Sequence, residues 1–91
     1  MQVALICRDK PNSLDTRMAN RPAHLDYLKS SGDMVLQAGA LPNAEGTPTG
    51  SLIVLEVASL TDAKDWATND PYAKAGLFED VHIAEWKKVI G

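Results

Sequence analysis

The chain has 91 residues, of which 45% are hydrophobic and 23% are charged, and its net charge at pH 7 is −3. These values predict a single globular domain over residues 1–91, and the acidic balance without a basic run argues against nucleic acid as a partner. No apolar stretch is long enough to span a membrane, and the single cysteine, Cys7, cannot form an internal disulfide, so we expect a cytoplasmic protein.

Hydrophobic runs and their spacing predict four strands and two main helices. Ser13 is a good N-cap for the first helix, and Ser59 and Asp62 resemble a capping box at the start of the second. In chain order, we expect a strand at 3–7, a helix at 14–29, a strand at 34–38, a loop at 39–50, a strand at 51–57, a helix from 59 to 70, a helical turn at 72–78 and a strand at 81–90.

The first predicted helix contains Pro22 near its middle. Because proline removes a backbone donor, it either kinks this helix or opens a second helix near Arg21. In the second case, Arg17 need not share a face with His24.

The predicted order is β-α-β-β-α-β, which is the ferredoxin-like order of the α+β class. We expect a four-stranded antiparallel sheet with both helices on one face. The first and third strands are apolar at almost every position, which is typical of strands that are buried on both faces. We therefore expect the other sheet face to pack against a second copy of the chain, most simply as a symmetric homodimer.

Three polar residues recur at near-helical spacing in the first helix, namely Arg17, Arg21 and His24. Histidine can move protons near neutral pH, and arginine can hold an anion. On a helical wheel Arg21 lies close to the apolar direction, and Arg17 and His24 lie to one side of it. That apolar direction is set by Leu14, Met18 and Leu25. The alternatives are that Arg21 turns to solvent and that His24 is a hydrogen-bonded structural residue.

An acid–base role for His24 requires a carboxylate that fixes its tautomer. Asp9, Asp33 and Asp70 are the candidates. We favour Asp70 because the Asp70–Pro71 pair lies at the exit of the second helix, which runs beside the first helix in this fold. Tyr72 is close in sequence and can donate a hydrogen bond to a ligand, although a packed core tyrosine is the more usual case.

The sequence resembles the YciI-like family over nearly the whole chain. The segments that carry the resemblance are RDKPNSL at 8–14, RMANRPAHL at 17–25, QAGALP at 37–42, TGS at 49–51, ATNDPYAKAGLF at 67–78 and EWKKV at 85–89. The resemblance implies a dimeric ferredoxin-like fold and a cleft with a His–Asp dyad. Carried across by position, His24 is the histidine and Asp70 is the aspartate.

Most members of this family have no assigned reaction, and the best-defined relative is a chlorohydroxyhydroquinone dehydrochlorinase, so the resemblance implies a cofactor-independent enzyme that eliminates HCl from a small aromatic substrate. His24 and Asp70 would then be catalytic, with no metal. The expected substrate-binding residues are Arg17, Arg21, Tyr72, Gly39, Leu41 and Pro42. The alternative is a non-catalytic module that binds a small acid, in which the two arginines matter more than His24.

Overall fold

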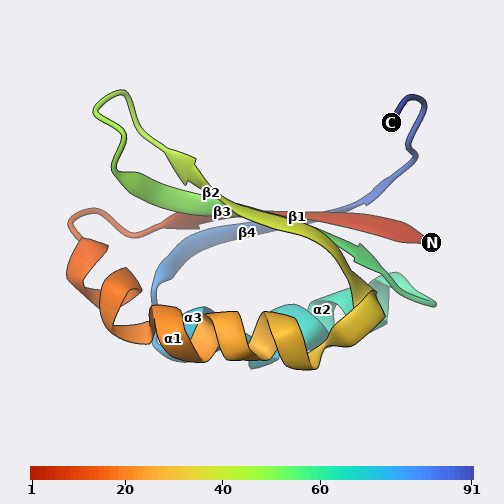
Figure 1. The fold of residues 1–91 in the computed structure, drawn as a ribbon, viewed down its shortest axis with the longest axis horizontal. Coiled ribbons are helices and arrows are strands. Elements are labelled where there is room, and N and C mark those ends of the chain that lie inside the picture. The colour runs from red at the N-terminus through yellow and green to blue at the C-terminus, as the bar shows by residue number, and fades with distance from the viewer.

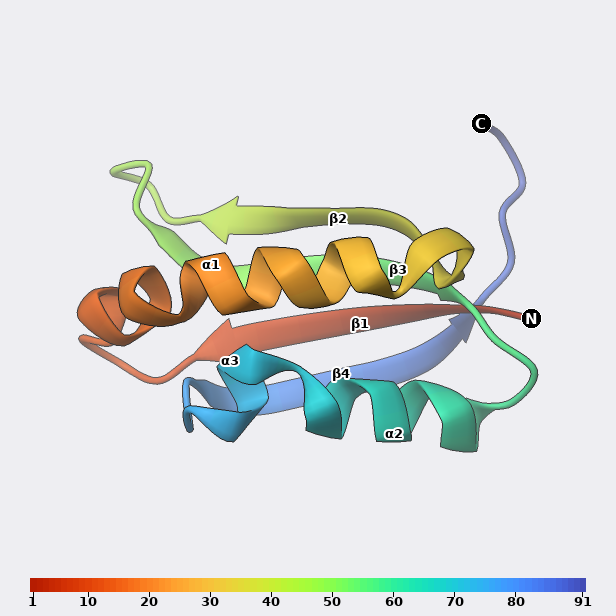
Figure 2. The ribbon, with the colours of Figure 1, turned by 60° about the horizontal axis from the view of Figure 1, so that its bottom comes forward.

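The computed structural model describes residues 1–91, and its elements follow the expected order (Figure 1). The elements are β1 (Gln2–Asp9), α1 (Leu14–Ser30), a short 3-10 helix (Gly32–Met34), β2 (Val35–Pro42), β3 (Pro48–Glu56), α2 (Leu60–Asn69), α3 (Pro71–Lys74) and β4 (Phe78–Trp86). The strands form one antiparallel sheet in the order β2-β3-β1-β4. All the helices cover one face of this sheet, which confirms the ferredoxin-like fold (Figures 1 and 2).

The first helix is continuous across Pro22, so this proline does not start a second helix. The first turns of α1 run at an angle to the rest of the helix (Figure 1). The predicted apolar direction is wrong, because Leu14 and Met18 are 42% and 53% exposed. The buried residues of α1 are instead Arg17 and His24, since this part of the helix covers polar groups of the sheet.

The connection between β2 and β3 is much shorter than the loop predicted at 39–50. Strand β2 continues to Pro42 and β3 begins at Pro48, because their backbones pair through most of that segment. The remaining turn is closed by Asn43, whose side-chain oxygen accepts hydrogen bonds from the backbone of Glu45 and Thr47. Gly46 takes the left-handed conformation, at φ 84°, that this turn requires.

The last strand lies at Phe78–Trp86 and not at 81–90. Trp86 pairs with Gln2, the first residue of β1, so residues beyond Trp86 have no strand to pair with. The C-terminal residues instead leave the sheet on the side away from the helices (Figure 1). Val89 and Ile90 in this segment are 91% and 90% exposed.

The hydrophobic core lies between the helices and the inner face of the sheet. Its buried members are Val3, Leu5, Cys7, Ile53, Leu55, Val57, Ala63 and Trp66. The alternation along β1 and β3 places the strand members of this core on one face of the sheet, and Ala63 and Trp66 come from α2. Ser59 caps α2 as predicted, with its hydroxyl accepting from the backbone of Asp62.

The thiol of Cys7 is expected to be unreactive in the folded protein. Burial, with the charge of Asp70 as a smaller cause, raises the pKa of Cys7 to about 12, and the side chain is 1% exposed. Only the thiolate is an effective nucleophile, so at pH 8 an aromatic disulfide reagent should label Cys7 only after unfolding in urea. Rapid labelling of the native protein at pH 8 would contradict this expectation.

Candidate active site

A buried hydrogen bond joins the middle of α1 to the junction of α2 and α3. His24 Nδ1 lies 2.8 Å from Asp70 Oδ1, with the two side chains only 8% and 2% exposed. A carboxylate only accepts hydrogen bonds, so Nδ1 carries the proton and Nε2 is left as the basic nitrogen. The geometry pairs His24 with Asp70 and with neither Asp9 nor Asp33.

Local structure fixes the position of Asp70. The residue before a proline favours extended backbone, and Asp70 has φ −61° and ψ 129°, which ends α2. The same residue is the N-cap of α3, since its Oδ1 also accepts from the Tyr72 backbone at 2.9 Å. Asp33 lies exposed in the short 3-10 helix and makes no side-chain hydrogen bond.

Arg17 forms a second buried pair, with Asp9 at the end of β1. Its Nε and Nη2 donate to the two carboxylate oxygens at 2.7 and 2.9 Å, and Nη2 also donates to Ser51 Oγ at 3.0 Å. Burial acts to lower the pKa of Arg17, but the hydrogen bond and charge of Asp9 outweigh it, so the pKa is raised. Arg17 is therefore a charged residue whose guanidinium is held in place by two hydrogen bonds to Asp9.

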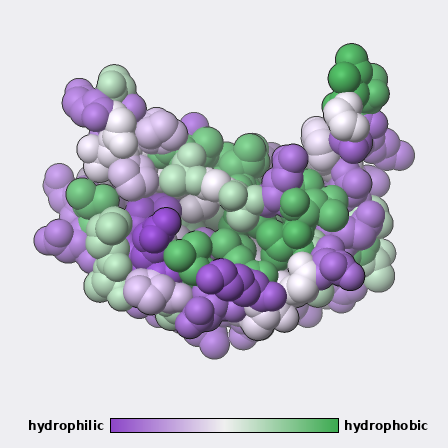
Figure 3. Space-filling model, in the orientation of Figure 1, coloured by the Kyte–Doolittle hydropathy of each residue, from purple (hydrophilic) through white to green (hydrophobic).

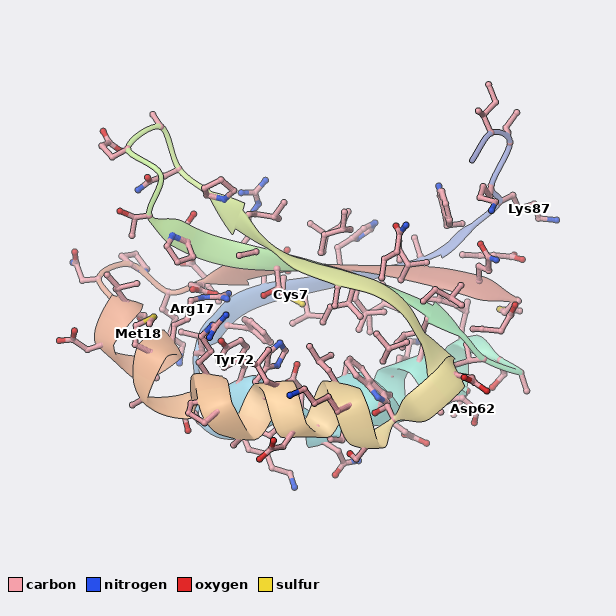
Figure 4. All side chains as sticks on the ribbon, in the orientation of Figure 1. Cys7, Arg17, Met18, Asp62, Tyr72 and Lys87 are labelled. Atoms are coloured by element: carbon pink, nitrogen blue, oxygen red, sulfur yellow. The ribbon has the colours of Figure 1, made fainter.

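Tyr72 contacts both His24 and Arg17. Its ring stacks on the His24 imidazole with centroids 3.9 Å apart and planes 14° from parallel, and Arg17 Cζ lies 4.7 Å from the same ring centre. Arg17 and Tyr72 lie together between α1 and the sheet, close to Cys7 (Figure 4). Burial raises the pKa of the Tyr72 hydroxyl, and the positive charges of Arg17 and Arg21 act against this rise. The hydroxyl thus stays protonated at neutral pH.

These side chains line a pocket of about 170 Å³ between α1, β2 and β3. Between α1 and the edge strand β2, hydrophilic side chains gather toward one end and hydrophobic ones toward the other (Figure 3). The lining residues are Arg17, Arg21, His24, Leu25, Leu28, Ala38, Gly39, Ala40, Ser51, Ile53 and Tyr72. Arg21 is exposed and makes no ion pair, so it is the uncompensated positive charge at this pocket.

The structure brings together most, but not all, of the residues expected at the site. Gly39 lines the pocket from β2, whereas Leu41 and Pro42 do not. The segment 39–42 is strand and not a turn, so Leu41 is directed to a shallow hollow on the opposite side of the sheet edge. A larger hollow of about 310 Å³ lies between the β1–α1 loop and the β2–β3 turn, and His24 is not part of it.

Sequence reasoning missed Ser51 and the role of Asp9. Because side chains alternate along β3, Ser51 lies on the same inner face of the sheet as Ile53 and Leu55. A single polar residue on this otherwise apolar face was the sequence feature that could have revealed it. Asp9 was considered only as a partner for His24. Its pairing with Arg17 depends on how the end of β1 is placed against α1, which no local pattern reveals.

No group of three or more His, Cys, Asp or Glu side chains is arranged to hold a metal ion. No helix combines the length and apolar character needed to cross a membrane. The titratable groups of the pocket are one histidine, one tyrosine and two arginines, with two carboxylates behind them. This set can transfer a proton and stabilise an anion.

Comparison with known proteins agrees with this fold. Protein YciI from Escherichia coli is 37% identical over 97 residues, covering 98% of this chain and 99% of that protein. An uncharacterized protein from Haemophilus influenzae shows the same identity and coverage. Among solved structures, 5-chloro-2-hydroxyhydroquinone dehydrochlorinase (TftG) from Burkholderia phenoliruptrix, in complex with 2,5-dihydroxybenzoquinone, is 32% identical. Its TM-score is 0.90, covering 96% of this chain and 94% of that chain.

The family assignment rests on the full length of the domain. The model of the YCII-related domain matches residues 1–87, which span every strand and helix described above. With this match and the relatives at 37% identity, the chain belongs to the family of YCII-related domain proteins.

Proposed function

We propose that this protein is a cofactor-independent enzyme that eliminates HCl from a chlorinated hydroxyhydroquinone, with His24 and Asp70 as an acid–base dyad. The observation that carries the proposal is the buried His24–Asp70 hydrogen bond beside a pocket that also holds arginine. The similarity to TftG, whose name states this reaction, supports the choice of substrate class.

The reaction needs only proton transfers and the loss of chloride. His24 Nε2 takes a proton from a ring hydroxyl and can return it to the carbon that bears chlorine. The C–Cl bond then breaks, chloride leaves with the electron pair, and a second hydroxyl releases its proton, which leaves a hydroxyquinone plus HCl. Asp70 stabilises the imidazolium that forms after the first transfer, and Arg21 stabilises the negative charge on the ring oxygen.

The size of the pocket fits a single substituted ring. A protein cavity of about 150 Å³ holds benzene, and this pocket measures about 170 Å³. Leu25, Leu28 and Ile53 supply apolar surface for the ring, and Arg17, Arg21 and His24 line the same pocket.

The direct test is chloride release from 5-chloro-2-hydroxyhydroquinone, measured under anaerobic conditions so that the substrate does not oxidise in air. We expect turnover above the rate in buffer, with one chloride released for each quinone formed. The absence of any rate above buffer, with protein shown to be folded, would exclude this substrate.

The second candidate is a binding module for a small acid, which the uncompensated charge of Arg21 favours. On this hypothesis, Arg21→Ala weakens the binding of 2,5-dihydroxybenzoquinone in a thermal-shift titration, whereas His24→Ala leaves binding nearly unchanged. Since a ligand that binds the folded state raises the melting temperature, the two variants separate a binding role from a catalytic one.

We also propose that the protein is a homodimer through the sheet face opposite the helices. That face carries Leu36, Leu52 and Trp86, which are 44%, 42% and 40% exposed, and the exposed C-terminal tip on the same side is hydrophobic (Figures 1 and 3). Large exposed apolar patches mark interfaces.

Leu52→Lys should therefore convert the dimer to a monomer, because it places a charge on the middle of this face. Light scattering coupled to gel filtration measures the mass directly. The control is Lys64→Leu, which replaces a charged side chain with an apolar one on the exposed side of α2. Because this position lies away from the proposed interface, the variant should have the same mass as the wild type. A wild-type mass of one chain at micromolar concentration would contradict the proposal.

A further inference from the structure

The arrangement around Tyr72 includes a buried carboxylate that the proposed chemistry does not use. Asp9 does not line the pocket, yet its side chain is only 5% exposed and its two oxygens both bind Arg17. Burying an ion pair has a desolvation cost, and a single pair of this kind is not by itself stabilising. The contacts of Arg17 indicate what the pair does.

We propose that Asp9 and Tyr72 are positioning residues, which act together through Arg17 to hold the His24 ring in its productive orientation. Tyr72 performs this role with the face of its ring, which makes both contacts, while its hydroxyl lies near Arg17 and adds to the rise in the Arg17 pKa. The inference rests on the proposed acid–base role of His24 and assigns the residues that orient it.

The Tyr72 ring contacts two side chains of the same helix, α1. Arg17 and His24 are seven residues apart, which corresponds to about 10.5 Å along a helix axis. Both nevertheless contact the one ring, with Arg17 Cζ at 4.7 Å and the His24 centroid at 3.9 Å from its centre. The ring therefore packs against both the guanidinium and the imidazole and limits the rotation of each.

Each end of this stack is anchored by a buried carboxylate. Asp9 holds Arg17, and Ser51 adds a third hydrogen bond to the same guanidinium. Asp70 holds His24 and also accepts from the Tyr72 backbone, so it ties the start of α3 to the imidazole. The rings of Phe78 and Tyr72 also meet edge to face, with centroids 6.0 Å apart and planes at 83°.

The charges of Arg17 and His24 beside the Tyr72 ring explain why Arg17 needs the carboxylate of Asp9. An aromatic face attracts a cation, and the Tyr72 ring has Arg17 near it permanently. When His24 takes a proton, a second cation faces the same ring. The carboxylate of Asp9 neutralises Arg17, so the two cations repel each other less than they otherwise would.

The test compares Tyr72→Phe with Tyr72→Leu, and Asp9→Asn with Asp26→Asn, which changes an exposed acid of α1. The readout is the ¹⁵N spectrum of the imidazole of His24, assigned with the help of His82→Asn, in the full-length protein without ligand. We expect one tautomer, protonated at Nδ1, in the wild type, Tyr72→Phe and Asp26→Asn. Tyr72→Leu and Asp9→Asn should show exchange between tautomers or a broadened signal.

Turnover of 5-chloro-2-hydroxyhydroquinone gives the second readout. Because small misplacements of a catalytic group cost up to about 100-fold, Asp9→Asn and Tyr72→Leu should lower kcat about 10- to 100-fold, while Asp26→Asn stays within about twofold. For Asp9→Asn the loss should lie in kcat more than in KM, since Asp9 does not line the pocket.

The imidazole spectrum does not depend on turnover. An inactive wild type would therefore contradict the proposed function, while the orientation of His24 could still be tested. A sharp, unchanged His24 signal in folded Tyr72→Leu would overturn the inference. So would a loss of the single tautomer in Tyr72→Phe, because it would assign the role to the hydroxyl. If Asp9→Asn does not fold, the pair of Tyr72 variants decides.

Discussion

His24→Ala is expected to lower kcat for HCl elimination by about 10²- to 10⁴-fold, which is the usual contribution of a positioned acid–base group. The physical reason is that His24 offers the free Nε2 at the pocket, while its Nδ1 is bound by Asp70. The melting temperature, measured alongside, shows whether the variant is folded.

Asp70→Asn is expected to have a smaller effect than His24→Ala. Asparagine keeps a carbonyl oxygen that can accept from His24 and from the Tyr72 backbone, but it removes the charge that stabilises the imidazolium. A hydrogen bond to a charged group contributes about 1.5–3 kcal/mol, so we expect kcat to fall about 10- to 150-fold.

The matched control for both variants is His82→Ala, which removes the exposed histidine of β4. It should turn over at the wild-type rate. Full turnover by folded His24→Ala would show that the dyad assignment is wrong, whereas full turnover by Asp70→Asn alone would restrict the role of Asp70 to hydrogen bonding.

Gly50→Ala is expected to lower the stability of the fold by about 1–3 kcal/mol, as overpacking of a tight site does. A Cβ at position 50 would lie 2.5 Å from the backbone oxygen of Cys7 on the neighbouring strand, and a paired backbone cannot easily move away. For a domain of this size, the melting temperature should fall by roughly 5–20 °C.

Gly39→Ala is the control for this prediction. It makes the same change in the adjacent strand β2, where a Cβ would meet no atom within 4 Å. Calorimetry should therefore find Gly39→Ala within a few degrees of the wild type. Equal melting temperatures for the two variants would mean that the close approach of β1 and β3 at Gly50 does not limit stability.

Local patterns were sufficient for the order of the elements and for the start and end of α2. Ser59 is an N-cap, and Asp70–Pro71 is a terminator, because both act on backbone groups within a few residues of themselves. The predicted bounds of β2 and β4 were wrong because the ends of these strands are not set by nearby residues. Strand ends depend on which partner backbone is available, and that partner lies far away in the sequence.

The candidate site was predicted in part. The resemblance to the YciI-like family suggested His24 and Asp70, and the structure gives their separation as 2.8 Å. The helical wheel failed, since it assumed that Leu14 and Met18 face the core. Those side chains are exposed because the first half of α1 lies over a polar pocket and uses Arg17 and His24 on its buried side.

The sequence alone determined the alternation of strands and helices and a short set of polar residues that could do chemistry. The Ser59 cap and the stop at Asp70–Pro71 act on nearby backbone groups, so they can be identified without a structure. Only the tertiary structure decided that Asp9 pairs with Arg17, that Asp70 pairs with His24, and that the Tyr72 ring contacts both Arg17 and His24. These contacts join β1, α1 and α3, and their distances follow from how the helices pack on the sheet.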